Sequence, residues 1–219
     1  MENRIMERKS PVAMPTAPEQ VTRRGDWTVA LRYGGEGAGP WLVDLSHGAK
    51  WDFQSAALET LTPWGMAIPE KPGQCRFAGG MLCSRLNRTQ AIAWHIAGAP
   101  PPAPGGEAVT DVSDATMLLA LVAVDPTGIL EKVTALDFQR PQRPWPFVLQ
   151  GPVAHVPCRV VHLGPGADGT NALLINCARG YARDMAHALL AAGDEFGLRP
   201  AGEQAWNGWV AAMEQSAAA

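Results

Sequence analysis

Two short segments place an aspartate and a serine two residues apart at the end of an extended run. One is Asp111-Val-Ser113, and the other is Asp44-Leu-Ser46, which is followed by His47, at an offset of 67 residues (111 − 44). Aspartate and serine at such positions commonly accept hydrogen bonds from backbone N–H groups of a turn. On the rim of a cavity the same groups can bind a polar ligand, and a histidine can act there as an acid or base. Local capping is the more common use of these residues, and both interpretations stay open.

A second group of polar residues lies toward the C-terminus. Asn176 stands in the apolar run 172–177, so its amide needs hydrogen-bond partners once the run is buried. These partners can be backbone groups of the following turn or the ring of a bound ligand. Arg179 and Arg183 flank Tyr181 at an expected helix start, where backbone N–H and guanidinium groups together suit an anion. A solvated helix face is the alternative for both arginines.

The cysteines show no C-x-x-C spacing, which zinc sites and redox dithiols usually have. They are Cys75, Cys83, Cys158 and Cys177. We therefore expect reduced core thiols and neither a metal site nor a redox pair. Three of the eight tryptophans, Trp145, Trp206 and Trp209, are candidates for anchoring a partner protein, because tryptophan is favoured at interface hot spots.

Apolar periodicity and turn residues predict the elements that position these groups. Asp125 and Pro126 serve as N-cap and first residue of a helix that follows a buried strand over 117–124 and continues to Leu136. The strand 27–33 is expected to pair in a hairpin with the strand that begins at Trp41. Further strands are expected near 81–86, 91–96, 109–113, 153–163 and 172–177, and further helices near 55–62, 181–192 and 203–213.

The order of elements is the same in both halves of the chain. In each half the Asp-x-Ser segment is followed by an extended run, a candidate helix, and two strands of which the first contains a cysteine. This order predicts an internal duplication. The expected fold class is α+β, with helices on one face of a largely antiparallel sheet. We expect one compact domain with an extended or mobile arm over residues 1–25, a first half-repeat over 26–98 and a second over 107–219.

Composition excludes several classes of partner. A chain of 219 residues with 47% hydrophobic content can bury a substantial core. Its net charge of −3 does not predict nucleic-acid binding, which needs a concentrated basic face. No apolar run approaches the ~20 residues that span a bilayer, and no signal peptide opens the sequence. These features predict a cytoplasmic protein without a membrane partner.

Three stretches in the second half resemble a known family. Asp111-Val-Ser113 with the strand and helix after it is similar to the D-V-S-H segment of the glycine-cleavage T-protein and of the shorter gamma subunit of heterotetrameric sarcosine oxidase. The run LLINCARGYARDMAH, ending at His187, resembles the T-protein's V-N-A…R-x-K-D segment, and FGLRPAG, ending at Gly202, resembles the G-L-x-P-x-G that follows it. The chain length and the segment Lys9-Ser-Pro-Val12 favour the short sarcosine oxidase gamma-like members.

The resemblance implies a folate-binding domain of the aminomethyltransferase type, built from two intertwined ferredoxin-like halves. It also implies chemistry of one-carbon units, with tetrahydrofolate as the candidate cofactor. The residues that it indicates for cofactor binding are Asn176, Arg179, Asp111 and Ser113.

The catalytic groups of that family are missing. The aspartate that it carries before the V-N-A strand is replaced by the uncharged neighbourhood of Ala154-His-Val-Pro-Cys158, and its later arginine and acid are lost in Ala205-Trp-Asn-Gly-Trp209. No catalytic residue is therefore assigned. The sequence predicts a non-catalytic or assisting subunit in one-carbon or amine metabolism, bound to protein partners of an oxidase or one-carbon complex or to itself. The alternatives are a small tetrahydrofolate-dependent aminomethyltransferase with a non-standard acid, such as Asp168 or Asp44, and a scaffold that binds no small molecule.

Overall fold

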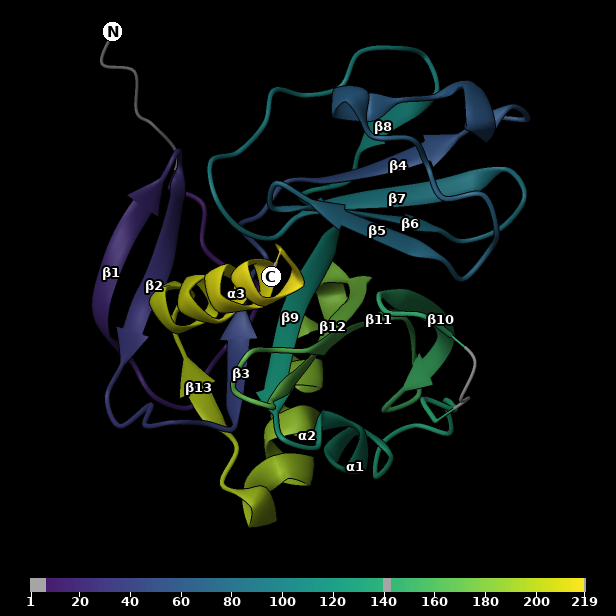
Figure 1. Ribbon diagram of the computed structural model, residues 1–219. Coiled ribbons are helices and arrows are strands. Elements are labelled where there is room, and N and C mark those ends of the chain that lie inside the picture. Colours follow the sequence, from purple (N-terminus) through teal and green to yellow (C-terminus); the bar gives the residue numbers. More distant parts are fainter. Residues whose placement is uncertain (1–6, 140–142, 219) are drawn as a thin grey trace, which may run out of the picture.

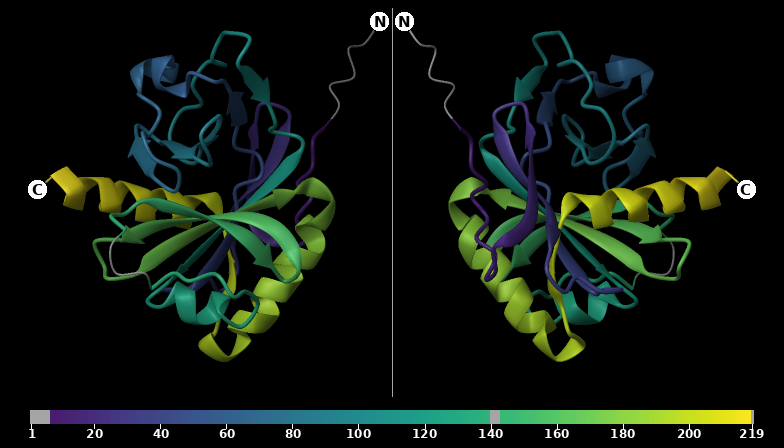
Figure 2. Two further views of the ribbon diagram at one scale, coloured as in Figure 1. Left: turned by 90° about the vertical axis from the view of Figure 1, so that its right-hand side faces the viewer. Right: turned by 90° about the vertical axis from the view of Figure 1, so that its left-hand side faces the viewer.

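The computed structural model describes residues 7–139 and 143–218. The described strands form three sheets, of two, six and five strands, in an α+β arrangement (Figure 1). The six-stranded and five-stranded sheets lie at different ends of the molecule, and helix α3 (Glu203–Ala218) lies between them (Figure 2). Within the described ranges, no helix is both long enough and apolar enough to cross a membrane.

The six-stranded sheet carries most of the second half of the chain. Its neighbours pair antiparallel except for β13 and β3, which are parallel, so the expectation of a largely antiparallel sheet is confirmed. Its order is β10 (Phe147–Val153), β11 (Val156–Pro165), β12 (Asn171–Ala178), β9 (Thr116–Ala123), β3 (Trp41–Asp44) and β13 (Arg199–Ala201).

Successive side chains of a strand point to opposite faces of the sheet, and both faces of this sheet are covered by other elements. Leu119 and its odd-numbered neighbours in β9 pack with α1 (Pro126–Leu130) and α2 (Ala182–Gly193). Leu118 and its even-numbered neighbours pack with α3 and with the five-stranded sheet. Burial on both faces explains the continuous apolar run of β9. The expectation that all helices cover one face is wrong.

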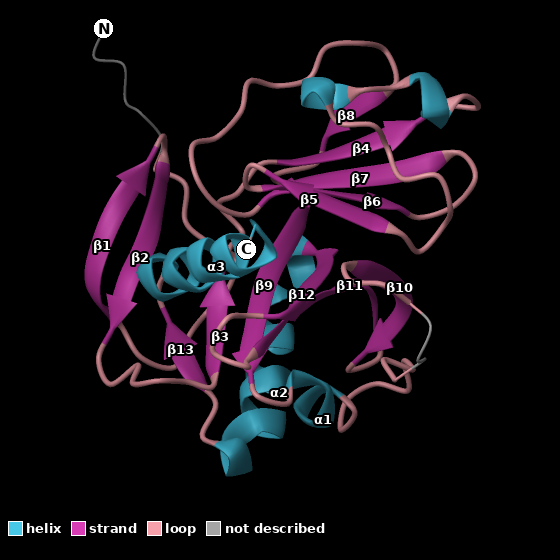
Figure 3. Cartoon of the chain, viewed as in Figure 1, coloured by secondary structure: helices cyan, strands magenta, loops and turns pink. Residues whose placement is uncertain are grey.

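The five-stranded sheet forms the other lobe (Figure 3). One face contributes Leu82 and Trp94 to the core shared with the six-stranded sheet. The other face carries Trp51 and Phe53, which pack with Leu58 of a short 3-10 turn. The order is β5 (Cys75–Ala78), β6 (Met81–Arg85), β7 (Gln90–His95), β4 (Lys50–Gln54) and β8 (Val109–Asp111).

The chain crosses between the two large sheets twice, in opposite directions. It leaves the six-stranded sheet at the end of β3 and enters the five-stranded sheet at β4, and it returns between β8 and β9. β3 therefore pairs with β9, and β4 pairs with β8. Each sheet thus contains a strand from the opposite half of the sequence.

Helix α3 links the two lobes through two tryptophans. The Trp206 indole N–H donates to the carbonyl of Ile96 at 2.6 Å, and that of Trp209 donates to Thr170 Oγ1 at 2.7 Å. The rings stack at a centroid distance of 5.5 Å and an angle of 16°. Both are buried, at 0% and 5% exposure, so the expectation that they anchor a partner is wrong.

One predicted pairing is wrong, and one strand forms where none was expected. β2 (Trp27–Tyr33) forms a two-stranded sheet with β1 (Pro18–Arg24), and not the expected hairpin with β3. β10 lies in a region where no strand was expected. It tolerates Pro152 because it is the edge strand of its sheet, where a missing N–H costs no ladder hydrogen bond.

Two predicted helices are shorter than expected. The segment 55–62 contains only the 3-10 turn Leu58–Thr60, because Pro63 follows it closely and Ser55 Oγ accepts from the Ala57 N–H in a turn. Helix α1 starts as predicted, with Asp125 accepting a hydrogen bond from the Gly128 N–H at 2.9 Å. The helix ends at Leu130. The chain after it lies against the turn that follows β10, where the Ala154 N–H donates to the Val133 carbonyl.

Replacing Trp206 by alanine should be strongly destabilising. The substitution removes a fully buried ring and leaves the Ile96 carbonyl without its donor. We expect a loss of about 3–5 kcal/mol in the free energy of unfolding, measured by urea denaturation. Trp145→Ala, at a 54% exposed tryptophan, is the matched control and should cost about 1 kcal/mol or less. Equal losses in the two variants would contradict the role given to α3.

Candidate functional site

The two Asp-x-Ser segments lie at the two crossings and bind each other's strands. Each aspartate closes its own turn, since Oδ1 accepts from the serine N–H two residues on, at 2.9 Å for Asp44 and 2.8 Å for Asp111. Ser46 Oγ accepts from the Leu118 N–H at 3.1 Å. Ser113 Oγ accepts from the Lys50 N–H at 2.9 Å. The two aspartates thus make the contacts of local capping, whereas each serine hydroxyl binds a strand that is remote in the sequence.

The pattern is reciprocal. The backbone N–H of Leu45 donates to the carbonyl of Leu118, and that of Val112 donates to the carbonyl of Lys50, each at 2.9 Å. Lys50 and Leu118 therefore take equivalent places in the two crossings. Gly48 lies in the first turn, and a larger residue does not fit there because its Cβ would collide with the His95 carbonyl.

Lys50 is a buried cation that the sequence analysis did not single out. It is fully buried, and its ammonium donates to the carbonyls of Ser46 at 2.8 Å and Gly48 at 2.7 Å. Burial lowers the pKa of Lys50 to about 8, and the nearby carboxylates of Asp44 and Asp111 offset only part of that effect. A signal was present in the strand pattern: Trp51 and Phe53 alternate toward one core and place Lys50 on the opposite, inner face.

Arg179 lies beside this crossing. Its backbone N–H donates to the Ala115 carbonyl at 2.9 Å, and its guanidinium donates to the Lys9 carbonyl at 3.1 Å. The guanidinium groups of Arg179 and Arg8 both lie over the Trp27 ring, 5.7 and 5.8 Å from its centroid. The N-terminal segment around Lys9 therefore contacts the place where an anion was expected. Arg183 is exposed, which matches a solvated helix face.

Asn176 is separate from this group. It is 1% exposed, its amide N–H donates to the Met117 carbonyl at 2.6 Å, and its Oδ1 lies 3.4 Å from Arg159 Nη1. The structure thus brings Asp111, Ser113 and Arg179 together around Lys50, and it places Asn176 within the sheet. Cofactor binding by these four residues stays a prediction.

The space between the two large sheets is filled by apolar side chains. Leu82 and Trp94 from one sheet and Leu118, Val161 and Leu174 from the other belong to one cluster of buried residues. One amide N–H of Asn176 and the hydroxyl of Ser113 already donate to backbone carbonyls. These residues do not fit a reduced folate between the sheets in this conformation.

His47 has a partner that lies 156 residues away in the sequence. Its Nε2 lies 3.0 Å from Glu203 Oε1, and Arg24 donates to Glu203 Oε2 at 2.8 Å. Burial acts to raise the pKa of Glu203, but the hydrogen bonds and charges of His47 and Arg24 outweigh it and hold the pKa at about 2. Among the described residues Glu203 is the only buried carboxylate. The pair fastens the start of α3 to the β3–β4 crossing.

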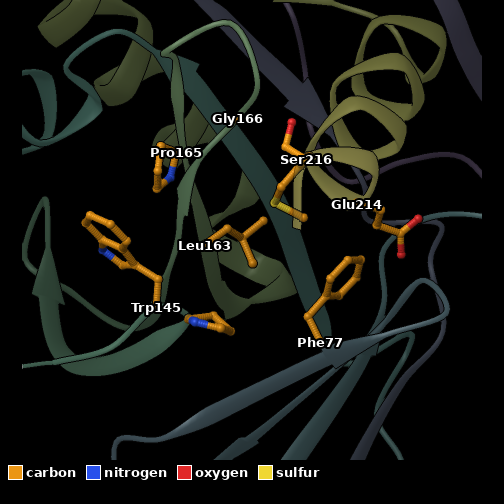
Figure 4. A pocket seen from close by; sticks show the side chains of 9 residues that line it. Phe77, Trp145, Leu163, Pro165, Gly166, Glu214 and Ser216 are labelled. Atoms are coloured by element: carbon orange, nitrogen blue, oxygen red, sulfur yellow. The ribbon is translucent and has the colours of Figure 1, made fainter. Parts of the chain in front are cut away.

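An apolar cavity of about 710 Å³ opens at one end of the space between the sheets (Figure 4). Side chains from both sheets and from the end of α3 surround it, including Phe77, Trp145, Leu163, Met213 and Glu214. Trp145 is 54% exposed, so this tryptophan remains available to a partner. Across the described ranges, no three His, Cys, Asp or Glu side chains are grouped to hold a metal ion.

The fold formed by these sheets and crossings is similar to that of two solved structures. The chain is similar to a chain of the heterotetrameric sarcosine oxidase from Corynebacterium sp. U-96, solved in complex with pyrrole 2-carboxylate, with a TM-score of 0.59 and 17% identity over 71% of this chain and 84% of that one. It is also similar to the glycine cleavage system aminomethyltransferase T from Bartonella henselae, with a TM-score of 0.61 and 18% identity over 87% of this chain.

The chain spans 57% of that aminomethyltransferase. Neither the protein-family models nor the curated proteins give a match to the sequence. The two structural similarities confirm, at the level of the fold, the resemblance inferred from the sequence.

The charge of Lys50 should appear in the pH dependence of stability. The pKa of Lys50 is about 8 in the folded protein and 10.5 ordinarily, so between these values the unfolded chain binds the extra proton and the folded protein gains stability as pH rises. Relative to Lys50→Met, the wild-type free energy of unfolding should increase by about 3 kcal/mol from pH 8 to pH 10.5.

Urea titrations at a series of pH values measure this difference. Subtracting the free energy of unfolding of Lys50→Met from that of the wild type removes the contribution of the thiols and tyrosines that titrate in the same range. Lys71→Met, at an exposed lysine, is the matched control and should parallel the wild type. Parallel curves for wild type and Lys50→Met would contradict a buried ammonium with a lowered pKa.

Proposed function

We propose that this protein is a non-catalytic or assisting subunit with the aminomethyltransferase fold, acting in one-carbon or amine metabolism as part of a larger assembly. The observation that carries the proposal is the filled space between the two sheets. A ligand pocket of ordinary size needs a few hundred Å³ with free polar groups. Here Trp94 and Leu82 occupy the centre of that space and the nearby polar groups are bound to backbone, while the cavity of about 710 Å³ at its end is lined mainly by apolar side chains.

The disposition of carboxylates supports the same proposal. A general acid or base must reach the proton that it transfers. Glu203 is held by His47 and Arg24 in an ion pair, and Asp168 Oδ1 accepts from the Thr170 N–H and hydroxyl in its own turn. Asp44 is used in the turn before Ser46.

The partner follows from the assembly in which the similar chain occurs. The similar sarcosine oxidase is named as a heterotetramer, and by analogy we propose that this chain also binds protein partners. The wall formed by Trp145, Phe77 and Met213 provides an apolar surface for one. Self-association through the same wall is the alternative. A cytoplasmic location and the lack of a nucleic-acid partner stay predictions.

We further propose that the two halves are diverged copies of one ferredoxin-like unit. The support is the reciprocal pattern at the crossings, in which Ser46 binds the strand after Ser113 and Ser113 binds the strand after Ser46. A duplicated unit explains both contacts by a single arrangement.

The alternative function is a small tetrahydrofolate-dependent aminomethyltransferase with a non-standard acid. The observation in its favour is a cavity of about 140 Å³ lined by Asp44, His47 and Tyr33. This volume is below that of ordinary ligand pockets, so the cavity would have to enlarge before it admitted a pterin.

Calorimetry with tetrahydrofolate separates the two functions. For the purified chain we expect no saturable heat, which corresponds to a dissociation constant above about 1 mM. A glycine-cleavage T-protein titrated in the same way is the positive control. Saturable binding that is lost in both Asn176→Ala and Arg179→Ala would contradict the proposed role and favour the transferase.

A further inference from the structure

Two of the four cysteines are neighbours across adjacent strands. The ladder between β11 and β12 pairs Arg159 with Asn176, so the next step of this antiparallel register sets Cys158 opposite Cys177. Both side chains belong to the cluster beneath α2, with exposed fractions of 5% and 2%. The two side chains therefore lie on the same face of the sheet and point into the same cluster.

The positions are suitable for a covalent link. Residues directly opposite in an antiparallel pair have Cα atoms about 4.5 or 5.5 Å apart, depending on the hydrogen-bonding of the pair. Both separations lie within the range of roughly 4.4–6.8 Å that disulfides span. The bond can therefore form without movement of the strands.

The other two cysteines provide an internal contrast. Cys75 is opposite Ser84 in the β5–β6 ladder and lies 3.0 Å from its hydroxyl, whereas Cys83 is opposite Arg76. Cys75 packs toward the core between the large sheets, and Cys83 belongs to the cluster on the outer face. Side chains on opposite faces of a sheet cannot be joined by a disulfide without rebuilding the backbone.

A strained turn lies next to Cys158. Ala154 and His155 connect β10 to β11 with φ values of 47° and 66°, a conformation that side chains other than glycine adopt at a cost. β10 is an edge strand, and its Gly151 is the residue paired with Cys158. Local opening of this hairpin exposes the Cys158 thiol to small molecules, because edge strands and strained turns open more readily than the core of a sheet.

We propose that Cys158 and Cys177 are a redox pair that a peroxide converts to a cross-strand disulfide. The Cys158 thiolate attacks one oxygen of hydrogen peroxide and breaks the O–O bond, which yields a sulfenic acid and a hydroxide; this hydroxide takes up the proton that the Cys158 thiol lost and becomes one water. The Cys177 sulfur then attacks the sulfenic sulfur, and the hydroxide that leaves combines with the Cys177 proton as a second water. Hydrogen peroxide accepts the two electrons that the thiols lose.

The product fastens the hairpin to the strand that holds Asn176. β11 and β12 are then joined covalently one step from the Arg159–Asn176 pair, and the strained turn can no longer open freely. The Cys177 thiol also prepares the first step, since its hydrogen bond lowers the pKa of Cys158. The inference depends neither on folate binding nor on a partner subunit.

Peptide mapping of the whole chain tests the proposal. The folded protein is treated with hydrogen peroxide, free thiols are blocked with N-ethylmaleimide, and peptides are analysed without reduction. We expect a linked Cys158–Cys177 peptide that is two hydrogens lighter than the two thiols and is released by dithiothreitol. Cys75 and Cys83 should be recovered blocked, and Cys83→Ser should form the same link at the same rate.

Two variants extend the test. In Cys177→Ser the second step is removed, so Cys158 should accumulate as a sulfenic acid that dimedone traps. His155→Gly, which relieves the positive φ, should slow disulfide formation several-fold, and an unchanged rate would contradict access through the hairpin. A link that appears only in urea, or one between Cys75 and Cys83, would overturn the proposal.

Discussion

The structure depends on satisfying the backbone where the chain crosses twice between two sheets. Buried N–H and C=O groups must find partners, and a crossing interrupts the ladders that would otherwise supply them. Ser46 and Ser113 solve this in the same way, each providing a hydroxyl for the strand that follows the other. The two halves therefore cannot fold as separate units, since each sheet contains a strand and a capping hydroxyl from the opposite half.

The buried lysine at one crossing marks the difference between the two halves. Leu118 occupies its place without cost, whereas Lys50 loses hydration that two carbonyls and the surrounding carboxylates restore only in part. Burying a cation whose lost hydration is only partly compensated costs stability. In this protein Lys50 orients the turn that also holds His47 and, through Glu203, the start of α3.

The interior between the sheets is the part of the structure on which the proposed non-catalytic role depends. Large apolar side chains such as Trp94 and Leu82 meet those of β9, β11 and β12, and the tryptophans of α3 complete the packing. A fold can persist while its site is replaced by core, because packing and chemistry use different residues. The remaining cavity lies at the end of this core and presents an apolar wall, which suits contact with another protein better than proton transfer.

The sequence by itself determined the local features. Runs such as 117–124 predicted a buried strand, and Asp125 and Pro126 predicted the start of α1. The turn preference of Asp-x-Ser predicted the capping contacts of Asp44 and Asp111. The α+β class followed from the order of these features, and the resemblance to the aminomethyltransferase fold rested on the matched motif residues.

Only the tertiary structure decided which remote elements meet. The pairing of β2 with β1 in place of β3, the exchange of strands between the halves, the His47–Glu203 contact and the juxtaposition of Cys158 with Cys177 join residues up to 156 positions apart. The burial of Trp206 and Lys50 belongs to the same class. Local periodicity specifies which face of an element is apolar, but the partner that covers this face is selected by the packing of the whole chain.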